Sequence, residues 1–167
     1  RKVLADAIIT RKKNIALGVV TADCVPVILY DERNKIIACI HAGWKGAFSG
    51  IVRNTISKIK KINNRNKIHA CIGPCIGKKS YEVDLDFYKK FVTQTKKNKL
   101  YFSFKNKKKK YFDLRKFVSD KLKEQKVLVD NVSRDTFKDR NNFFSYRRSS
   151  ILKEKDYGRC ISVVRLL

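Results

Sequence analysis

The 167-residue chain is long enough for one domain with a substantial core, and 43% hydrophobic and 11% aromatic residues exclude a disordered composition. No apolar run approaches the roughly 18 residues of a membrane span, and the opening RKVLADAIIT lacks a signal-peptide layout. The five cysteines, an odd number, indicate reduced thiols for metal binding, catalysis or burial. We therefore expect a cytoplasmic protein without a membrane partner.

The charge is strongly positive, with 40 lysines and arginines against 15 acidic residues. It indicates either nucleic-acid or anion binding or a lysine-rich surface in solvent. No nucleic-acid-binding motif accompanies it, so we favour the solvated surface and regard a basic nucleic-acid-binding module as an alternative. The lysine-rich segment 96–110 is expected to be exposed, with a short strand in it.

In the first half of the chain, short apolar runs predict strands, and the polar turn DERN separates the second from the third. These strands are expected at 15–20, 25–30 and 35–41. From Trp44 the apolar residues recur at three- and four-residue steps, which predicts an amphipathic helix ending near KINN, residues 61–64.

In the second half, a strand at 67–73 is expected to end at Gly73-Pro74. Helices are then predicted at 85–95 and 114–123, and strands at 126–131, 143–147 and 159–167. Strands interleaved with helices, without a repeat or a linker, indicate a single mixed α/β domain.

The second and third strands form a hairpin if Asp31–Asn34 is its four-residue loop. Tyr30 then pairs with Lys35, and Cys24 faces His41 as a direct cross-strand neighbour, with Cβ atoms roughly 4.5–5.5 Å apart. One face of the hairpin is apolar, formed by Val25, Val27, Leu29, Ile36, Ala38 and Ile40. Cys24 and His41 are either a thiolate–imidazole pair or a buried cysteine beside a satisfied histidine.

The stretch HAGWKG favours a site. His41 ends a strand, and a glycine turn and a helix start follow, which is where α/β proteins place binding residues. The free N–H groups of a helix N-terminus suit an anion such as phosphate, and Lys45 adds positive charge. The glycines serve the tight turn equally well.

Six motifs occur in order: ADAIIT, TADCVPVIL, HAGWKG, IGPCIGKKSYEV, FFSYRR and a late GR. Together, from Ala5 to Arg159, they resemble the laccase-domain family, also called the polyphenol oxidase-like or purine nucleoside phosphorylase family. The resemblance implies a layered α/β (α+β) sandwich with mixed β-sheets flanked by helices. It also implies similarity to the deamidase domain of cytotoxic necrotizing factors.

The resemblance implies zinc-dependent phosphorolysis of adenosine, inosine, guanosine and methylthioadenosine, together with adenosine deaminase activity. Older descriptions of the family imply copper and polyphenol oxidation instead. Cys24 and His41 match the family's cysteine and histidine metal ligands. The activity that the resemblance implies makes purine nucleosides and phosphate the expected partners. The family's third ligand is a histidine in an N-terminal region. We therefore expect residues 1–167 to be one domain that lacks its N-terminal part, with its true start upstream.

Further candidates are less defined. Asp23 either orients a metal-binding side chain through a hydrogen bond or caps a turn. Lys45, Arg147 and Arg148 are candidates for phosphate or substrate binding, although the two arginines could equally lie in solvent or in salt bridges. A homodimer is left open. A Cys–His hydrolase or deamidase, with Cys24 as nucleophile and His41 as base, is an alternative enzyme.

The remaining cysteines and the second histidine are not expected to bind the catalytic metal or take part in the reaction. Cys71 and Cys75 could complete a structural zinc site with Cys24 and His41, but burial of Cys71 and a turn role around Cys75 are favoured. Cys39 and Cys160 fall in strand patterns and are expected in the core. His69 precedes IGPCIG, where the family has no ligand.

Overall fold

The structure is a computed structural model that describes residues 5–63 and 65–167. Its centre is a five-stranded sheet in the order β1-β4-β3-β5-β9, antiparallel except for the parallel pair β5 and β9. The strands are β1 (Ala7–Thr10), β3 (Val25–Asp31), β4 (Ile36–Ala42), β5 (Ile68–Ile72) and β9 (Leu128–Asn131).

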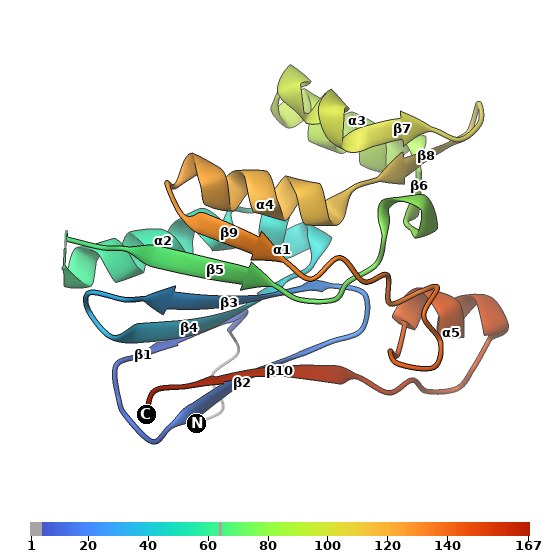
Figure 1. The fold of residues 1–167 in the computed structure, drawn as a ribbon. Helices are drawn as coiled ribbons and strands as arrows, with labels where there is room; N and C mark the ends of the chain where they lie inside the picture. Colours follow the sequence, from blue (N-terminus) through green and yellow to red (C-terminus); the bar gives the residue numbers. More distant parts are fainter. Residues whose placement is uncertain (1–4, 64) are drawn as a thin grey trace.

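Helices cover one face of this sheet and a second, two-stranded sheet covers the other (Figure 1). The covering helices are α1 (Trp44–Phe48), α2 (Ile51–Ile62) and α4 (Leu114–Glu124), and the second sheet pairs β2 (Ala16–Thr21) with β10 (Cys160–Arg165). This three-layer arrangement confirms the predicted layered α/β class with mixed sheets.

A third, smaller sheet lies at one end of the molecule (Figure 1). It has the order β6-β8-β7. Its strands and the remaining elements are β6 (Glu82–Asp84), β7 (Phe102–Phe104), β8 (Lys109–Phe112), the helices α3 (Leu85–Gln94) and α5 (Tyr146–Leu152), and the 3₁₀ helices η1 (Lys78–Ser80) and η2 (Lys96–Tyr101). The lysine-rich segment therefore contains more order than the expected short strand, because Asn98 and Tyr101 are buried in it.

The β3–β4 hairpin is the part of the core that the sequence patterning describes best. The predicted apolar face packs against the helices in the main core. The opposite face, which includes Ile28, Tyr30, Ile37 and Cys39, packs against β2 and β10. Both faces are therefore buried, as expected for a central strand pair in a layered fold.

The predicted hairpin register is wrong by two residues. Pro26 pairs with His41 and Asp31 with Ile36, so the four-residue turn is Glu32–Lys35. The cause is Asp31, which is fully buried and accepts hydrogen bonds from the side chains of Asn34 and Asn66. These bonds hold the carboxylate inside the strand instead of at the head of the turn. A two-residue shift leaves every side chain on its predicted face.

Two other predicted elements differ. The helix from Trp44 is divided at Ser49-Gly50, because Gly50 takes the left-handed conformation with φ of 89°; Asn64, at its expected end, lies outside the described residues. Residues 143–147 are not a strand. Ser145 caps α5 by accepting a hydrogen bond from the main-chain N–H of Arg148, and this cap starts a helix where aromatic residues suggested a strand.

In the described ranges, no helix combines the length and apolarity needed to cross a membrane.

Candidate active site

The side chains of Cys24 and His41 both lie close to Gly43. Cys24 directly precedes β3 and His41 lies at the end of β4, and the register places residue 24 opposite residue 43. A Cβ built on Gly43 would lie 3.0 Å from Cys24 Sγ, 3.6 Å from His41 Cε1 and 3.8 Å from His41 Nε2. The thiol and the imidazole therefore border one small space, diagonally and not as the direct neighbours that the sequence predicted.

Asp6 holds the other side of the His41 ring. Its main-chain oxygen accepts a hydrogen bond of 2.8 Å from His41 N, and its Oδ1 lies 3.3 Å from His41 Nδ1. Asp6 is part of the ADAIIT motif, but no role was predicted for it, because its contact with His41 depends on the pairing of β1 with β4. The pairing leaves Nε2 as the ring nitrogen on the side of Gly43 and Cys24.

The Cys24 thiol is held in its neutral form. Burial, first of all, and then the negative charges of Asp23, Cys75 and Asp6, raise the pKa of Cys24 to about 11. A bound cation reverses this preference, because a coordinating thiol loses its proton. The donor types fit zinc, which binds cysteine sulfur and histidine nitrogen.

The described residues supply only part of a ligand set. Within them, no group of three or more His, Cys, Asp or Glu side chains converges on one point. The chain's own contribution at this site is thus one sulfur and one nitrogen donor, in a space kept open because Gly43 has no side chain.

A cavity of about 260 Å³ adjoins Cys24. It is lined by Ala22, Asp23, Cys24, Trp44, Ile76, Tyr81, Leu114, Tyr146 and Arg147. The guanidinium of Arg147 lies 5.3 Å from the centre of the Tyr81 ring, and its Nη1 donates a 2.9 Å hydrogen bond to Glu82 O. The cavity therefore combines aromatic walls, a cation and the candidate ligand Cys24.

Asp23 closes one wall of this cavity. It is buried, and its carboxylate accepts hydrogen bonds from Thr136 Oγ1 (2.7 Å), Ser145 Oγ (2.9 Å) and the main-chain N–H of Arg147 (2.6 Å). Its φ of 79° is left-handed, a conformation that aspartate tolerates better than most residues. Its carboxylate thus joins distant segments, whereas the carboxylate beside His41 is Asp6.

The cationic candidates have different surroundings. The Arg148 guanidinium donates to the carbonyls of Thr136, Phe137 and Phe143, so it holds the chain around α5 together. Lys45 is exposed, with its Nζ 5.7 Å from the centre of the Trp44 ring. Only Arg147 lines the cavity beside Cys24. Both arginines bond to main-chain carbonyls instead of forming the salt bridges that the sequence left open.

The other cysteines have different surroundings. Cys75 is fully buried and its Sγ accepts a 3.2 Å hydrogen bond from Arg115 Nε. Cys71 is exposed on β5, which contradicts the expected burial. Cys39 is in the core as predicted, whereas Cys160 is only partly buried.

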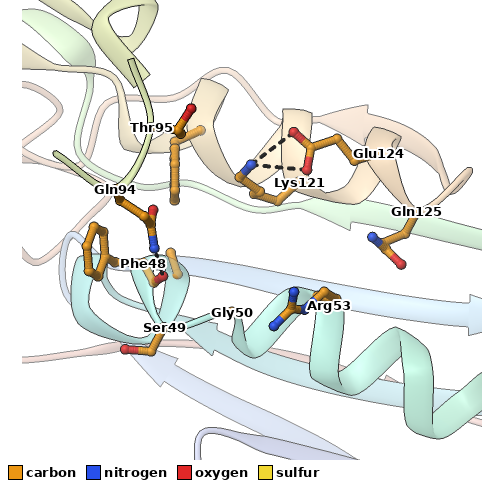
Figure 2. Close-up of a pocket in the computed structure, with 11 residues that line it drawn as sticks. Phe48, Ser49, Gly50, Arg53, Gln94, Thr95, Lys121, Glu124 and Gln125 are labelled. Atoms are coloured by element: carbon orange, nitrogen blue, oxygen red, sulfur yellow. Dashed lines mark hydrogen bonds and ion pairs between the residues drawn. The ribbon is translucent and has the colours of Figure 1, made fainter. Parts of the chain in front are cut away.

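A larger cavity of about 390 Å³ lies where α1, α2, α3 and α4 meet (Figure 2). Gln94 Nε2 donates to Phe48 O there, and Lys121 pairs with Glu124 (Figure 2). No cysteine or histidine lines this cavity. Its size alone does not make it the reaction site, and the candidate chemistry stays with the cavity beside Cys24.

The geometry defines a layered α/β protein with a thiol–imidazole pair at strand ends beside an aromatic cavity. Residues 2–167 match the family described as multi-copper polyphenol oxidoreductase laccase. The chain belongs to this family, which confirms the resemblance found in its motifs.

Named relatives agree with this assignment. The chain is 45% identical over 162 residues to "Purine nucleoside phosphorylase RC0672" of Rickettsia conorii, covering 96% of this chain and 67% of the relative. It is 36% identical over 178 residues to "Purine nucleoside phosphorylase Cj1217c" of Campylobacter jejuni, covering 96% and 66%. The chain therefore spans about two thirds of the length of these curated relatives.

Solved structures share the fold. The hypothetical protein YfiH of Bacillus licheniformis superimposes with a TM-score of 0.86 at 28% identity, covering 97% of this chain and 61% of that one. Protein NMB0706 of Neisseria meningitidis gives 0.84 at 32% identity, covering 97% and 64%. The likeness to the necrotizing-factor deamidase domain stays a prediction.

Proposed function

We propose that this chain carries the reaction site of a zinc-dependent purine nucleoside phosphorylase, formed by Cys24, His41 and the adjoining cavity. The observation that carries the proposal is the convergence of Cys24 Sγ and His41 Nε2 on the space above Gly43, next to a cavity with aromatic walls and a cation. The names of the relatives from Rickettsia and Campylobacter support the same activity.

Cys24, as thiolate, and His41, through Nε2, would hold the metal. When bound, zinc supplies a positive centre that polarises an oxygen or nitrogen of the substrate. A catalytic zinc site has three protein ligands and one open position, so one further protein donor would complete the site beside Cys24 and His41. Copper is the alternative metal that the family description suggests.

The cavity side chains suit a nucleoside. The flat faces of Trp44, Tyr81 and Tyr146 offer packing surfaces for a purine base. Leu114 and Ile76 make the remaining wall apolar, which excludes water from the base. The aromatic and apolar lining supports a nucleoside as the substrate class, with the sugar expected on the side of Cys24.

Phosphorolysis needs phosphate held against the sugar carbon. A phosphate oxygen forms a bond to C1′ while the C1′–N9 bond breaks and its electron pair goes to the purine. Arg147 is the cation best placed to hold this phosphate, since its Nη1 bond to Glu82 O fixes the guanidinium at the cavity wall. Arg148 is occupied by carbonyls, and Lys45 can attract phosphate from the exposed side of Trp44.

The proposed substrates of phosphorolysis are adenosine, inosine, guanosine and methylthioadenosine. Deamination of adenosine is proposed as a second reaction at the same site. A polyphenol oxidase would use copper and oxygen, and a Cys–His hydrolase would need no metal. These alternatives predict different requirements, so one set of assays separates them.

The test uses the full-length protein that contains this chain. We expect phosphate-dependent release of hypoxanthine from inosine, about one zinc per subunit, and loss of both in Cys24→Ala. The matched control is Cys71→Ala, which removes an exposed thiol of β5 and should retain activity and metal. Unchanged phosphorolysis in Cys24→Ala, or in protein stripped of metal, would overturn the proposal; oxygen consumption with phenols would favour the oxidase.

A further inference from the structure

One neighbouring residue, Asp6, contacts His41 through both its main chain and its side chain. β1 runs antiparallel to β4, with Ala7 opposite Ile40, so Asp6 comes next to His41. The main chains are joined by the 2.8 Å bond from His41 N to Asp6 O, and the side chains by the 3.3 Å contact of Nδ1 with Oδ1. Two contacts from one residue fix the ring relative to its own strand.

We propose that Asp6 is a positioning residue for His41, whose carboxylate holds the proton on Nδ1 and leaves the Nε2 lone pair facing Cys24. A neutral imidazole carries one proton, and the hydrogen bond made by one nitrogen decides which nitrogen is free. A carboxylate accepting from Nδ1–H also makes the other nitrogen a stronger donor to a metal. This inference rests on the proposed function only where it concerns the metal.

The charges around Asp6 support this role. The chain has 40 lysines and arginines against 15 acidic residues, and in the described ranges six acidic side chains pair with a lysine or arginine. Yet the ion-pair partner found for Asp6 in the described part of the chain is the imidazole of His41. A Cβ built on Gly46 would lie 3.7 Å from Asp6 Oδ2, so the second oxygen faces the start of α1.

A plain surface ion pair is the competing explanation. The Asp6 side chain is 56% exposed and that of His41 38% exposed, and such exposed pairs contribute little to folding. The molecule contains a comparable carboxylate–imidazole pair, because Glu32 Oε2 lies 3.3 Å from His69 Nε2 with similar exposure, although the same oxygen also pairs with Lys67 Nζ at 2.7 Å. The two pairs differ in what lies beyond the ring: the Cys24 thiol lies beside His41, whereas His69 does not line the cavity beside Cys24.

The experiment compares Asp6→Ala, Asp6→Asn and the control Glu32→Ala in the full-length protein. The first readout is the tautomer of neutral His41 in metal-free protein, from long-range ¹H–¹⁵N NMR correlations. We expect the Nδ1–H form in the unsubstituted protein and in Glu32→Ala, and a shift toward Nε2–H in Asp6→Ala. An unchanged tautomer in Asp6→Ala would overturn the inference.

The second readout is zinc affinity, measured by competition with a chromogenic chelator. Asp6→Ala should bind zinc 10- to 100-fold more weakly, Asp6→Asn less than 10-fold more weakly because its amide oxygen still accepts from Nδ1–H, and Glu32→Ala unchanged. Equal affinity in Asp6→Ala and Glu32→Ala would refute the positioning role. Cys24→Ala separates the two ideas: zinc retained there contradicts the proposed function, whereas the tautomer result stands by itself.

Denaturant midpoints provide the folding control. Asp6→Ala and Glu32→Ala should unfold at similar urea concentrations, since both remove an exposed carboxylate. If Asp6→Ala is much less stable than Glu32→Ala, a role in folding replaces the positioning role, and the conservative Asp6→Asn variant should then fail in the same way.

Discussion

Two aspartates border the candidate site and are held in contrasting ways. Asp23 is buried, 8% exposed, and bonds to Thr136, Ser145 and the main chain of Arg147. Asp6 is more than half exposed, and in the described part of the chain its ion-pair partner is the imidazole of His41. We call the first group the Asp23 hub and the second, with Cys24, His41 and Gly43, the His41 rim.

The difference separates a role in folding from a role in metal binding. The Asp23 hub ties the loop before β3 to residues more than a hundred positions later, and so fixes Cys24 relative to Arg147. The His41 rim has few hydrogen bonds, and Cys24 Sγ and the His41 ring lie close to Gly43. Loss of the hub should therefore cost mainly folding free energy, and changes at the rim should cost mainly metal affinity.

The largest effect is expected from Asp23→Ala. It removes the acceptor for three hydrogen bonds and places alanine at a φ of 79°, which alanine tolerates poorly. We expect a loss of roughly 3 kcal/mol or more in the free energy of unfolding. Urea denaturation followed by fluorescence of the single tryptophan, Trp44, measures it.

Asp23→Asn is the matched control, because asparagine keeps the shape and tolerates the left-handed conformation but carries no charge. It should lie between the unsubstituted protein and Asp23→Ala. A stability loss below about 1 kcal/mol in Asp23→Ala would show that the hub does not hold these segments together.

The next effect is expected at the rim, from Gly43→Ala. The new methyl group would enter the space bordered by Cys24 Sγ and His41 Nε2, 3.0 and 3.8 Å from the two atoms. The backbone at Gly43 has φ of −67° and ψ of 164°, which alanine adopts freely. We expect zinc affinity, measured by chelator competition, to fall about 100-fold while the unfolding free energy changes by less than about 1 kcal/mol.

Gly46→Ala is the control for this variant. A Cβ at Gly46, inside α1, would meet its nearest atoms at 3.6 to 3.7 Å, which is ordinary contact, so zinc affinity should hold. Equal zinc binding by Gly43→Ala and Gly46→Ala would contradict a shared metal between Cys24 and His41.

The sequence could predict which faces of β3 and β4 are buried, because the alternation of apolar residues fixes the side of each residue. It could not fix the register. A shift of two residues preserves that alternation, and the bonds that decide it join Asp31 to Asn66, 35 positions away. Cys24 and His41 were still placed on one face for the same reason.

The C-terminal part of the site was less predictable. The aromatic residues of FFSYRR suggested a strand, but the cap formed by Ser145 and the bond from Arg147 N to Asp23 impose a helix. The acceptors of Arg148 are main-chain carbonyls, which leave no signal in residue type. Asp6 was part of a recognised motif, and only strand pairing revealed its contact with His41.

A smaller, pH-dependent effect on stability is expected at Cys75. This residue is connected to the Asp23 hub, because the main-chain N–H of Thr136 donates a hydrogen bond to the Cys75 carbonyl. Burial raises the pKa of Cys75 from 9.0 to about 11, against the opposing charge of Arg115. A raised thiol pKa stabilises the fold below about pH 9, and this contribution is lost as the pH rises through 11.

The cost of Cys75→Ala, measured by urea denaturation, should therefore shrink between pH 8 and pH 10.5 by on the order of 1–2 kcal/mol. Cys71→Ala removes an exposed thiol and controls for the loss of a cysteine as such. An equal cost of Cys75→Ala at both pH values would contradict the assigned burial effect.

The smallest effect is expected from Lys45→Gln, at the outer side of the rim. Lys45 is exposed, and its recorded contact is the Trp44 ring at 5.7 Å, so the unfolding free energy should change by less than about 0.5 kcal/mol. If Lys45 attracts phosphate only through long-range charge, the KM for phosphate should rise up to about threefold at low salt. At 0.5 M salt the difference in KM should vanish, because the screening length is then only a few ångströms and distant charges no longer attract phosphate. A rise above tenfold that persists at high salt would instead mean direct contact with phosphate, and would make Lys45 a partner of Arg147 in the cavity.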